Sequence, residues 1–110
     1  LLGLAIDVRT RRPILGNITG GFAGPAIKPV ALRMVWQVAK AVNIPVSGLG
    51  GIMTGIDAIE FMMAGADTVQ IGTANIIDPN AMERIADEMD EWCDKNGVKD
   101  IQEIVGTLKA

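Results

Sequence analysis

Two hydrophobic spacings alternate along this chain, and their order predicts strands followed by helices. Short apolar runs occupy residues 44–49 and 67–71, which is the length of buried strands. Apolar residues at helical spacing occupy 28–42, 55–64 and 79–95 and predict three amphipathic helices. Strands that alternate with helices at intervals of about 20 residues indicate parallel βα units.

Residues that commonly cap the ends of helices flank these segments. Thr54 with Asp57 has the form of a capping box, and Asp78 followed by proline is typical of a helix start. Asp100 predicts a cap ahead of a short final helix at 101–108. Glycines at positions 65 and 97 are expected to end the helices before them.

The N-terminal quarter has a different pattern. Residues 4–8 predict a strand, 9–12 a turn and 13–15 a return strand, which together form a β-hairpin outside any parallel sheet. Residues 17–24 are too rich in glycine for a helix or strand interior, so we expect a loop there. The expected fold class is α/β, with a hairpin and glycine-rich loop at 1–24 and βα units with final helices at 25–110.

Composition limits the chemistry. The 110 residues, 49% of them hydrophobic, with a net charge of −3, are at most one domain that should fold or belong to something that folds. One Cys and no His leave no disulfide framework, no metal site and no imidazole base. No apolar run approaches the roughly 20 residues of a membrane span, and basic residues are scattered without aromatics. We therefore expect a cytoplasmic protein that binds neither membrane nor nucleic acid, and because it begins with Leu inside an apolar segment, we expect further chain upstream.

Both predicted parallel strands end in a glycine turn ahead of a helix. Gly50 and Gly51 follow the first strand, and Gly72 and Thr73 follow the second. Glycine lets backbone N–H groups approach a phosphate, and helix N-termini carry partial positive charge. In eight-stranded barrels the loops after strands 7 and 8 form such a phosphate site. The pair of turns is a candidate phosphate cradle, although tight βα turns alone would also explain the glycines.

Other candidate residues favour structural roles. Cys93 lies on the apolar stripe of the third helix and is expected to be a buried, inert thiol. Trp36 and Trp92 are expected to pack between helices. Asp7 and Asp67 lie on predicted strands, but neither has a partner acid or base in the sequence pattern.

Three runs of sequence resemble one enzyme family. They are NITGGFAGPAIKP at 17–29, IPVSGLGGI at 44–52, and AGA at 64–66 followed by VQIGTAN at 69–75. In this order and spacing they resemble the C-terminal part of the dihydroorotate dehydrogenases, most closely the class 1B catalytic subunit. The resemblance implies an FMN-binding (β/α)₈ TIM barrel that oxidises dihydroorotate to orotate in pyrimidine biosynthesis by hydride transfer to the flavin. Since such a barrel needs about 250 residues, the barrel would be incomplete in this chain.

The resemblance also implies roles for single residues. Gly24 matches a flavin-contacting glycine, and Gly50, Gly51, Gly72 and Thr73 match the flavin phosphate site. Where the family commonly has Leu-Ser before that first glycine, this chain has Phe-Ala, so a hydroxyl is lost. The family's cysteine base, its flavin-contacting lysine and its substrate asparagines would lie outside this chain. No catalytic residue is therefore expected in it, and the chain alone should be inactive.

By the same resemblance, the full subunit forms a homo-oligomer and joins an electron-transfer subunit that carries FAD and an iron-sulfur cluster and uses NAD. A fumarate-linked dehydrogenase and the matching domain of dihydropyrimidine dehydrogenase are close alternatives. Two further alternatives are an isomerase or synthase barrel that binds a sugar phosphate without flavin, and a small non-catalytic α/β module. Two strands cannot bury three apolar helix faces, which argues against the last.

Overall fold

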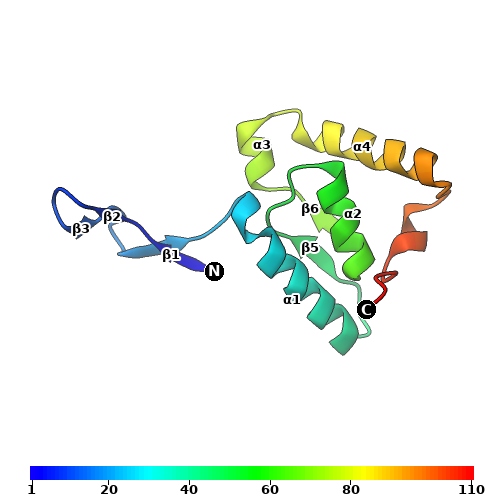
Figure 1. The fold of residues 1–110 in the computed structure, drawn as a ribbon, viewed down its shortest axis with the longest axis horizontal. Coiled ribbons are helices and arrows are strands. Elements are labelled where there is room, and N and C mark those ends of the chain that lie inside the picture. Colours follow the sequence, from blue (N-terminus) through cyan, green and yellow to red (C-terminus); the bar gives the residue numbers. More distant parts are fainter.

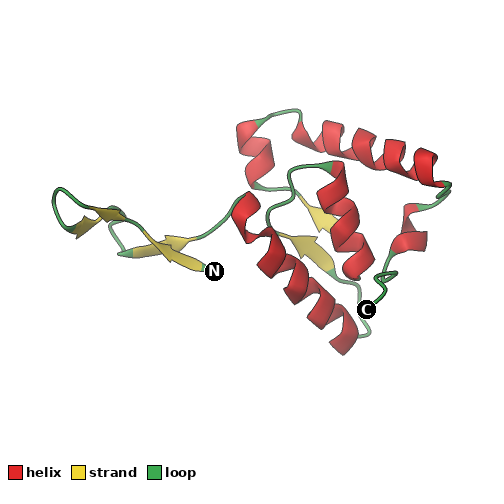
Figure 2. Cartoon of the chain, in the orientation of Figure 1, coloured by secondary structure: helices red, strands yellow, loops and turns green.

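The chain divides into an α/β body and a thin β arm that projects from it (Figure 1). The computed structural model describes all residues, 1–110, and measures 56 × 33 × 21 Å along its principal axes. The arm holds the first two dozen residues, and the body holds a small sheet with helices packed beside it (Figure 2). The last strand of the arm ends at residue 21, and the first helical turn of the body begins at residue 25.

The sheet of the body consists of two parallel strands, β5 (Ser47–Leu49) and β6 (Thr68–Gln70). Gly48 pairs with Val69, so the carboxyl ends of the two strands lie side by side. This confirms the prediction of parallel βα units. The strands are shorter than the apolar runs that predicted them, because Pro45 lacks an N–H and the N–H of Val46 donates to the carboxylate of Asp67 at 2.8 Å instead of to a backbone carbonyl.

Three long helices agree with the predicted spacing. They are α1 (Lys28–Ala41), which follows a 3₁₀ turn η1 (Pro25–Ile27), α2 (Gly55–Ala64) and α4 (Ala81–Asn96). The capping box of Thr54 and Asp57 is present in both directions, and Gly65 ends α2. Gly97 is left-handed and ends α4. Local cap chemistry therefore decides most of these boundaries.

The segment after β6 was predicted wrongly. Residues 73–77 form a short helix, α3 (Thr73–Ile77), where only a turn was expected. Its β-branched residues weaken the helical signal, but the side chain of Asn75 donates to the carbonyl of Ile71 at 2.8 Å and secures the turn. Asp78 does not cap α4: Asn80 is the N-cap residue, and Asp78 accepts its N–H at 3.0 Å.

The expected final helix at 101–108 is a single 3₁₀ turn, η2 (Ile101–Ile104), capped by Asp100 as predicted. Gly106 has a φ of +73°, which ends the helical backbone there. The tail then turns back to α2, where the N–H of Gly106 reaches the carbonyl of Met62 at 3.0 Å. Tertiary hydrogen bonds to the end of α2 thus replace the helix that local sequence suggested.

The arm contains two antiparallel pairs in place of one hairpin. The short pair β2 (Ile6–Asp7) and β3 (Arg12–Pro13) forms the expected hairpin, and β1 (Leu2–Leu4) pairs with β4 (Thr19–Gly21). The glycine-rich segment is therefore partly a strand, which corrects the loop prediction. Glycine fits at position 20 of this strand because the side chain of Leu15 occupies the space that a Cβ would take.

The core lies on one side of the sheet only. Gly48 faces α2, since a Cβ there would lie 2.8 Å from the ring of the fully buried Phe61. Ser47, Leu49, Thr68 and Gln70 lie on the other, open face. Only 16 of 110 residues are buried, and large apolar side chains along the arm are exposed. None of the helices has the length and apolar character that crossing a membrane requires.

Candidate functional site

All five residues predicted from the sequence line one cavity of about 290 Å³. The cavity lies where β5 and β6 end and where the arm joins the body. The tertiary structure therefore brings together three segments that are more than 20 residues apart. The lining residues are Phe22, Ala23, Gly24, Ile27, Leu49, Gly50, Gly51, Ile52, Met53, Gln70, Gly72 and Thr73.

The turn after β5 accepts only glycine. Gly50 and Gly51 have φ angles of +127° and +76°. A Cβ on Gly50 would lie 2.8 Å from the Cβ of Ala31, and one on Gly51 would lie 2.9 Å from the backbone nitrogen of Lys28. The turn is thus pressed against the first turns of α1, and its backbone is bare on the cavity side.

The other predicted residues complete the wall. Gly24, with a φ of +91°, and Thr73 approach each other, because a Cβ on Gly24 would lie 3.9 Å from the methyl carbon of Thr73. The carbonyl oxygen of Gly24 lies 3.0 Å from the Cβ position of Gly51. Gly72 differs from these glycines, since a Cβ there would meet no atom of the chain within 4 Å.

Backbone donors at the cavity are free to bind a ligand. The N–H groups of Gly51, Ile52 and Gly72 donate to no group within the chain, whereas that of Gly50 faces the carbonyl of Gln70 in the parallel ladder. No charged side chain belongs to the lining. Unpaired N–H groups and a threonine hydroxyl at the ends of parallel strands are suited to the oxygens of an anion, above all a phosphate.

The N-terminus of α2 does not contribute to this cradle, contrary to the sequence prediction. The N–H of Gly55 donates to Glu88 at 2.9 Å, and that of Asp57 donates to the hydroxyl of Thr54 at 3.2 Å. Met53 and Thr54 donate their N–H groups to Asp57. Carboxylates of the protein already occupy this helix start, so only the N–H groups of the loops are left for an anion.

A half-buried ion pair lies beside the turn after β5. The ammonium of Lys28 lies 2.8 Å from Asp57 Oδ1 and 2.6 Å from Glu60 Oε2. Hydrogen bonds to Asp57 and then Glu60 raise the pKa of Lys28. Burial by itself would raise the pKa of Asp57, but hydrogen bonds from Lys28, Met53 and Thr54 outweigh it and the pKa is lowered. Both groups are therefore held in their charged forms.

Arg84 on α4 binds the same turn and forms ion pairs of its own. The guanidinium of Arg84 on α4 donates to the carbonyl of Met53 at 3.1 Å, to Glu88 at 3.1 Å and to Asp78 at 3.3 Å. The N–H of Met53 reaches Asp57 at 3.0 Å. Both backbone groups of this lining residue are thus bound by charged side chains from two different helices.

Sequence reasoning missed Gln70. Its amide lines the cavity and donates to the hydroxyl of Ser47 at 3.1 Å, while Thr68 donates to the same hydroxyl at 3.0 Å. These three side chains lie on the open face of the sheet. The alternation of polar and apolar residues at 68–70 was the available signal, since residues two apart on a strand share a face.

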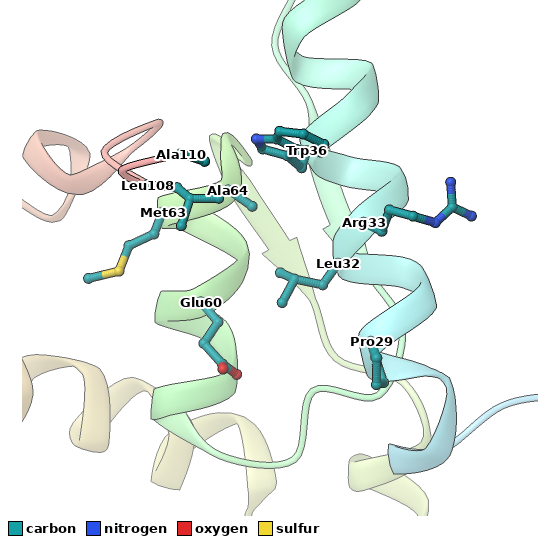
Figure 3. Close-up of a pocket in the computed structure, with 9 residues that line it drawn as sticks. All are labelled: Pro29, Leu32, Arg33, Trp36, Glu60, Met63, Ala64, Leu108 and Ala110. Atoms are coloured by element: carbon teal, nitrogen blue, oxygen red, sulfur yellow. The ribbon is translucent and has the colours of Figure 1, made fainter.

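A larger hollow of about 490 Å³ lies between α1 and α2, away from the predicted residues (Figure 3). Leu32 and Trp36 on α1 face Ala64 on α2 across it, and Leu108 of the tail lies at one end. Glu60 lies at its wall but is already paired with Lys28. Because the walls are mostly apolar, we assign the candidate site to the smaller cavity, which has the free donors.

The remaining candidate residues from the sequence analysis make contacts that support the fold. Asp67 accepts the N–H of Val46 at 2.8 Å, and Asp7 pairs with Arg9 at the exposed hairpin. Trp36 and Trp92 pack against the two hydrophobic clusters, as predicted. Cys93 is half-buried instead of buried, and burial, followed by nearby acidic residues, raises its pKa. The structure brings together no group of three or more acidic, Cys or His residues that could hold a metal ion.

Comparison with known protein families gives one clear match. The family model described as dihydroorotate dehydrogenase matches residues 1–92. Three relatives, each a catalytic subunit of dihydroorotate dehydrogenase B (NAD(+)), cover 99% of this chain. They come from Geobacter metallireducens (64% identical), Geobacter sulfurreducens (63%) and Bacteroides fragilis (58%). The match spans 36% of the length of each of these relatives.

Solved structures give the same result. A ligand-free DHODH from Eimeria tenella superimposes with a TM-score of 0.77, and the same enzyme in complex with ferulenol superimposes with a TM-score of 0.76. Both are 28% identical and cover 96% of this chain. The match spans 30% and 29% of those chains, respectively.

Proposed function

Because this chain belongs to the dihydroorotate dehydrogenase family, we propose that it supplies the flavin phosphate site of an enzyme that oxidises dihydroorotate to orotate. The observation that carries the proposal is the single cavity lined by Gly24, Gly50, Gly51, Gly72 and Thr73. The cofactor is FMN, whose terminal phosphate matches the free backbone donors of this cavity. The enzyme then acts in the synthesis of pyrimidines.

The residues present fit a phosphate. A Cβ on Gly51 would overlap Lys28 and Gly24, so glycine lets the turn pack closely against them, and the N–H groups of Gly51 and Gly72 have no acceptor within the chain. The hydroxyl of Thr73 adds one more donor. Gly24 accepts the close approach of the flavin without a side chain, and the lost hydroxyl at Ala23 removes no backbone contact.

The chain's own residues bind and orient the cofactor and take no part in bond making. The flavin, when bound, supplies the hydride acceptor for dihydroorotate oxidation. Phe22, Ile27 and Ile52 give the cavity an apolar wall, which limits water around the phosphate and strengthens the N–H contacts. The cysteine base and substrate-binding residues of the family lie outside this segment, so the chain alone is inactive.

The fold of the whole domain is a (β/α)₈ barrel, of which residues 1–110 form one segment. The open face of β5 and β6, with Ser47, Thr68 and Gln70, then faces the barrel interior. Residues 1–24 form an arm on that barrel, and 25–110 supply two βα units with final helices. That these are its last units stays a prediction from the chemistry of the two turns.

Further parts of the proposal concern partners. The relatives are named as catalytic subunits of an NAD(+) enzyme, which supports a second, electron-transfer subunit. That subunit carries FAD and an iron-sulfur cluster and passes electrons to NAD, and the catalytic subunit pairs with itself. These names favour the NAD-linked type over the fumarate-linked one. The enzyme is cytoplasmic.

The test is to purify the intact enzyme that contains this segment and to identify its cofactor. Visible flavin absorption, release of FMN on denaturation and dihydroorotate-dependent bleaching are expected. Thr73→Val keeps the shape of the side chain but removes its hydroxyl, so it should weaken FMN binding by about tenfold, the effect of one good hydrogen bond to a charged group. Thr10→Val, in the exposed turn of the arm, is the matched control.

A colourless enzyme that binds a sugar phosphate would support the flavin-free isomerase or synthase alternative and overturn the proposal. Equal FMN affinity in Thr73→Val and the parent enzyme would remove Thr73 from the site. A non-catalytic module predicts neither flavin nor turnover with any preparation of the intact protein.

A further inference from the structure

Lys28 connects two walls of the cavity without lining it. It begins α1, directly after the η1 turn that follows Gly24, and its backbone nitrogen lies 2.9 Å from the Cβ position of Gly51. Its ammonium crosses to α2 and meets Asp57 at 2.8 Å. Neither Lys28 nor Asp57 belongs to the cavity lining.

Asp57 links Lys28 to the turn that follows β5. One oxygen, Oδ1, receives the Lys28 ammonium, and the other, Oδ2, accepts the N–H groups of Met53 at 3.0 Å and Thr54 at 3.1 Å. Met53 lines the cavity two residues after Gly51. A carboxylate that accepts several hydrogen bonds at once fixes the backbone that donates them.

Glu60 ensures that the lysine stays in place. It lies one helical turn after Asp57 on α2 and meets the same ammonium at 2.6 Å. The Lys28 side chain is only 28% exposed and that of Asp57 only 15%, so the pair is partly shielded from water. Shielded, doubly bonded ion pairs have defined geometry, unlike pairs on an open surface.

From this geometry we propose that Lys28 is a positioning residue for the cofactor phosphate: acting through Asp57, it fixes the N–H donors of Gly51 and Ile52 relative to Gly24. The inference rests on the proposed function, since it assigns the fixed donors to a phosphate. Lys28 touches no ligand itself. Its loss frees the turn to move, so that the donors no longer converge, while the apolar wall of the cavity stays.

The experiment compares FMN with riboflavin, which lacks the phosphate, on the apo form of the intact enzyme. Lys28→Met keeps the aliphatic stem but removes the charge. We expect it to weaken FMN binding by roughly tenfold, the scale seen when a supporting partner of a ligand-binding group is removed. Riboflavin binding should change less than about twofold, because no phosphate contact is lost. Flavin fluorescence quenching measures both dissociation constants.

Two further variants keep the test sharp. Lys28→Arg preserves the charge and should restore much of the FMN preference, whereas Asp57→Asn should repeat the loss seen in Lys28→Met. Arg33→Met removes a cation one turn further along α1, where Arg33 bonds only to Gln37, and should change neither constant. Circular dichroism melting of each apo variant separates misfolding from local effects.

Each outcome decides one proposal. Suppose that the parent enzyme prefers FMN to riboflavin. If Lys28→Met then weakens the binding of both flavins to the same extent, or weakens the binding of neither, the positioning role is wrong and the phosphate site stands. If the parent enzyme binds riboflavin as tightly as FMN, the proposed phosphate site itself is wrong. A selective loss of FMN affinity that Lys28→Arg rescues supports the inference.

Discussion

The backbone N–H of Gly55 donates to the carboxylate of Glu88 at 2.9 Å, and this contact brings the start of α2 directly against α4. A Cβ on Gly55 would overlap the Cβ of Glu88 and lie 2.9 Å from the backbone nitrogen of Met89. The helices therefore touch through bare backbone, and this close approach holds the turn beside the cavity.

Gly55→Ala should destabilise the protein, although the same change in an exposed helix usually stabilises it by about 1 kcal/mol. The added methyl group forces α2 and α4 apart, at a cost of roughly 1–3 kcal/mol. The melting temperature of the intact enzyme should fall by several degrees. Gly16→Ala is the control, because a Cβ there meets nothing within 4 Å. A raised melting temperature for Gly55→Ala would show that the close packing is wrong.

If the proposed phosphate site is correct, Gly72→Ala should weaken FMN binding without destabilising the apoenzyme. A Cβ at Gly72 meets no atom of the chain within 4 Å, and its φ of −109° is negative, so only a ligand in the cavity competes with the methyl group. We expect at least about tenfold weaker binding, since one lost phosphate contact is worth over 1 kcal/mol. Unchanged affinity would exclude Gly72 from the site.

The ion pair of Lys28 and Asp57 should make a pH-dependent contribution to stability. The pKa of Asp57 is lowered in the folded state, so its contribution is complete above the ordinary value of 3.8 and is lost as the pH falls through the folded value. The pKa of Lys28 is raised, so its contribution is complete below 10.5 and is lost as the pH rises through the folded value. The pair thus stabilises the fold across the neutral range.

Asp57→Asn tests this window. The variant should melt below the parent enzyme at neutral pH, and the difference should shrink as the pH falls below 3.8. Glu91→Gln is the control, because Glu91 pairs with Lys95 on an exposed face of α4. A melting difference that does not depend on pH would mean that Asp57 acts through packing and not through charge.

Cys93 should react slowly with iodoacetamide at neutral pH. Burial, followed by the negative charges of Asp90 and Asp94, raises the pKa of its thiol above the ordinary 9.0, so little thiolate is present. The rate of alkylation of Cys93 should rise steeply only in strongly alkaline buffer. Glutathione, the reference thiol, should react at lower pH. Urea-unfolded protein should lose this protection. Fast modification of the folded protein at neutral pH would contradict the raised pKa.

Residues 1–110, expressed alone, should self-associate. The open face of the sheet and the arm expose apolar side chains such as Leu2, Val8 and Ile14. Light scattering should give a mass above the 11.6 kDa of one chain, with binding of a hydrophobic dye. A monomer with one cooperative unfolding transition would mean that the segment folds independently.

Local signals in the sequence determined the class of fold and most element boundaries. The periodicity of apolar residues predicted α1, α2, α4 and the parallel pair of β5 and β6. The capping box of Thr54 and Asp57 lies within four residues, so it is visible without tertiary information. The two glycine turns likewise indicated the site, because only glycine tolerates the backbone conformation that Gly50 and Gly51 adopt.

Only the tertiary structure decided which donors remain free and what holds them. The sequence predicted that the start of α2 would face a phosphate, but Glu88, 33 residues away, occupies the N–H of Gly55. Lys28 on α1 reaches Asp57 on α2, Arg84 on α4 reaches the carbonyl of Met53, and nothing in their local spacing indicates these contacts. Hydrogen bonding is decided by which groups meet in space. The sequence alone therefore indicated most of the elements and the candidate site, and long-range packing decided which donors the cavity keeps.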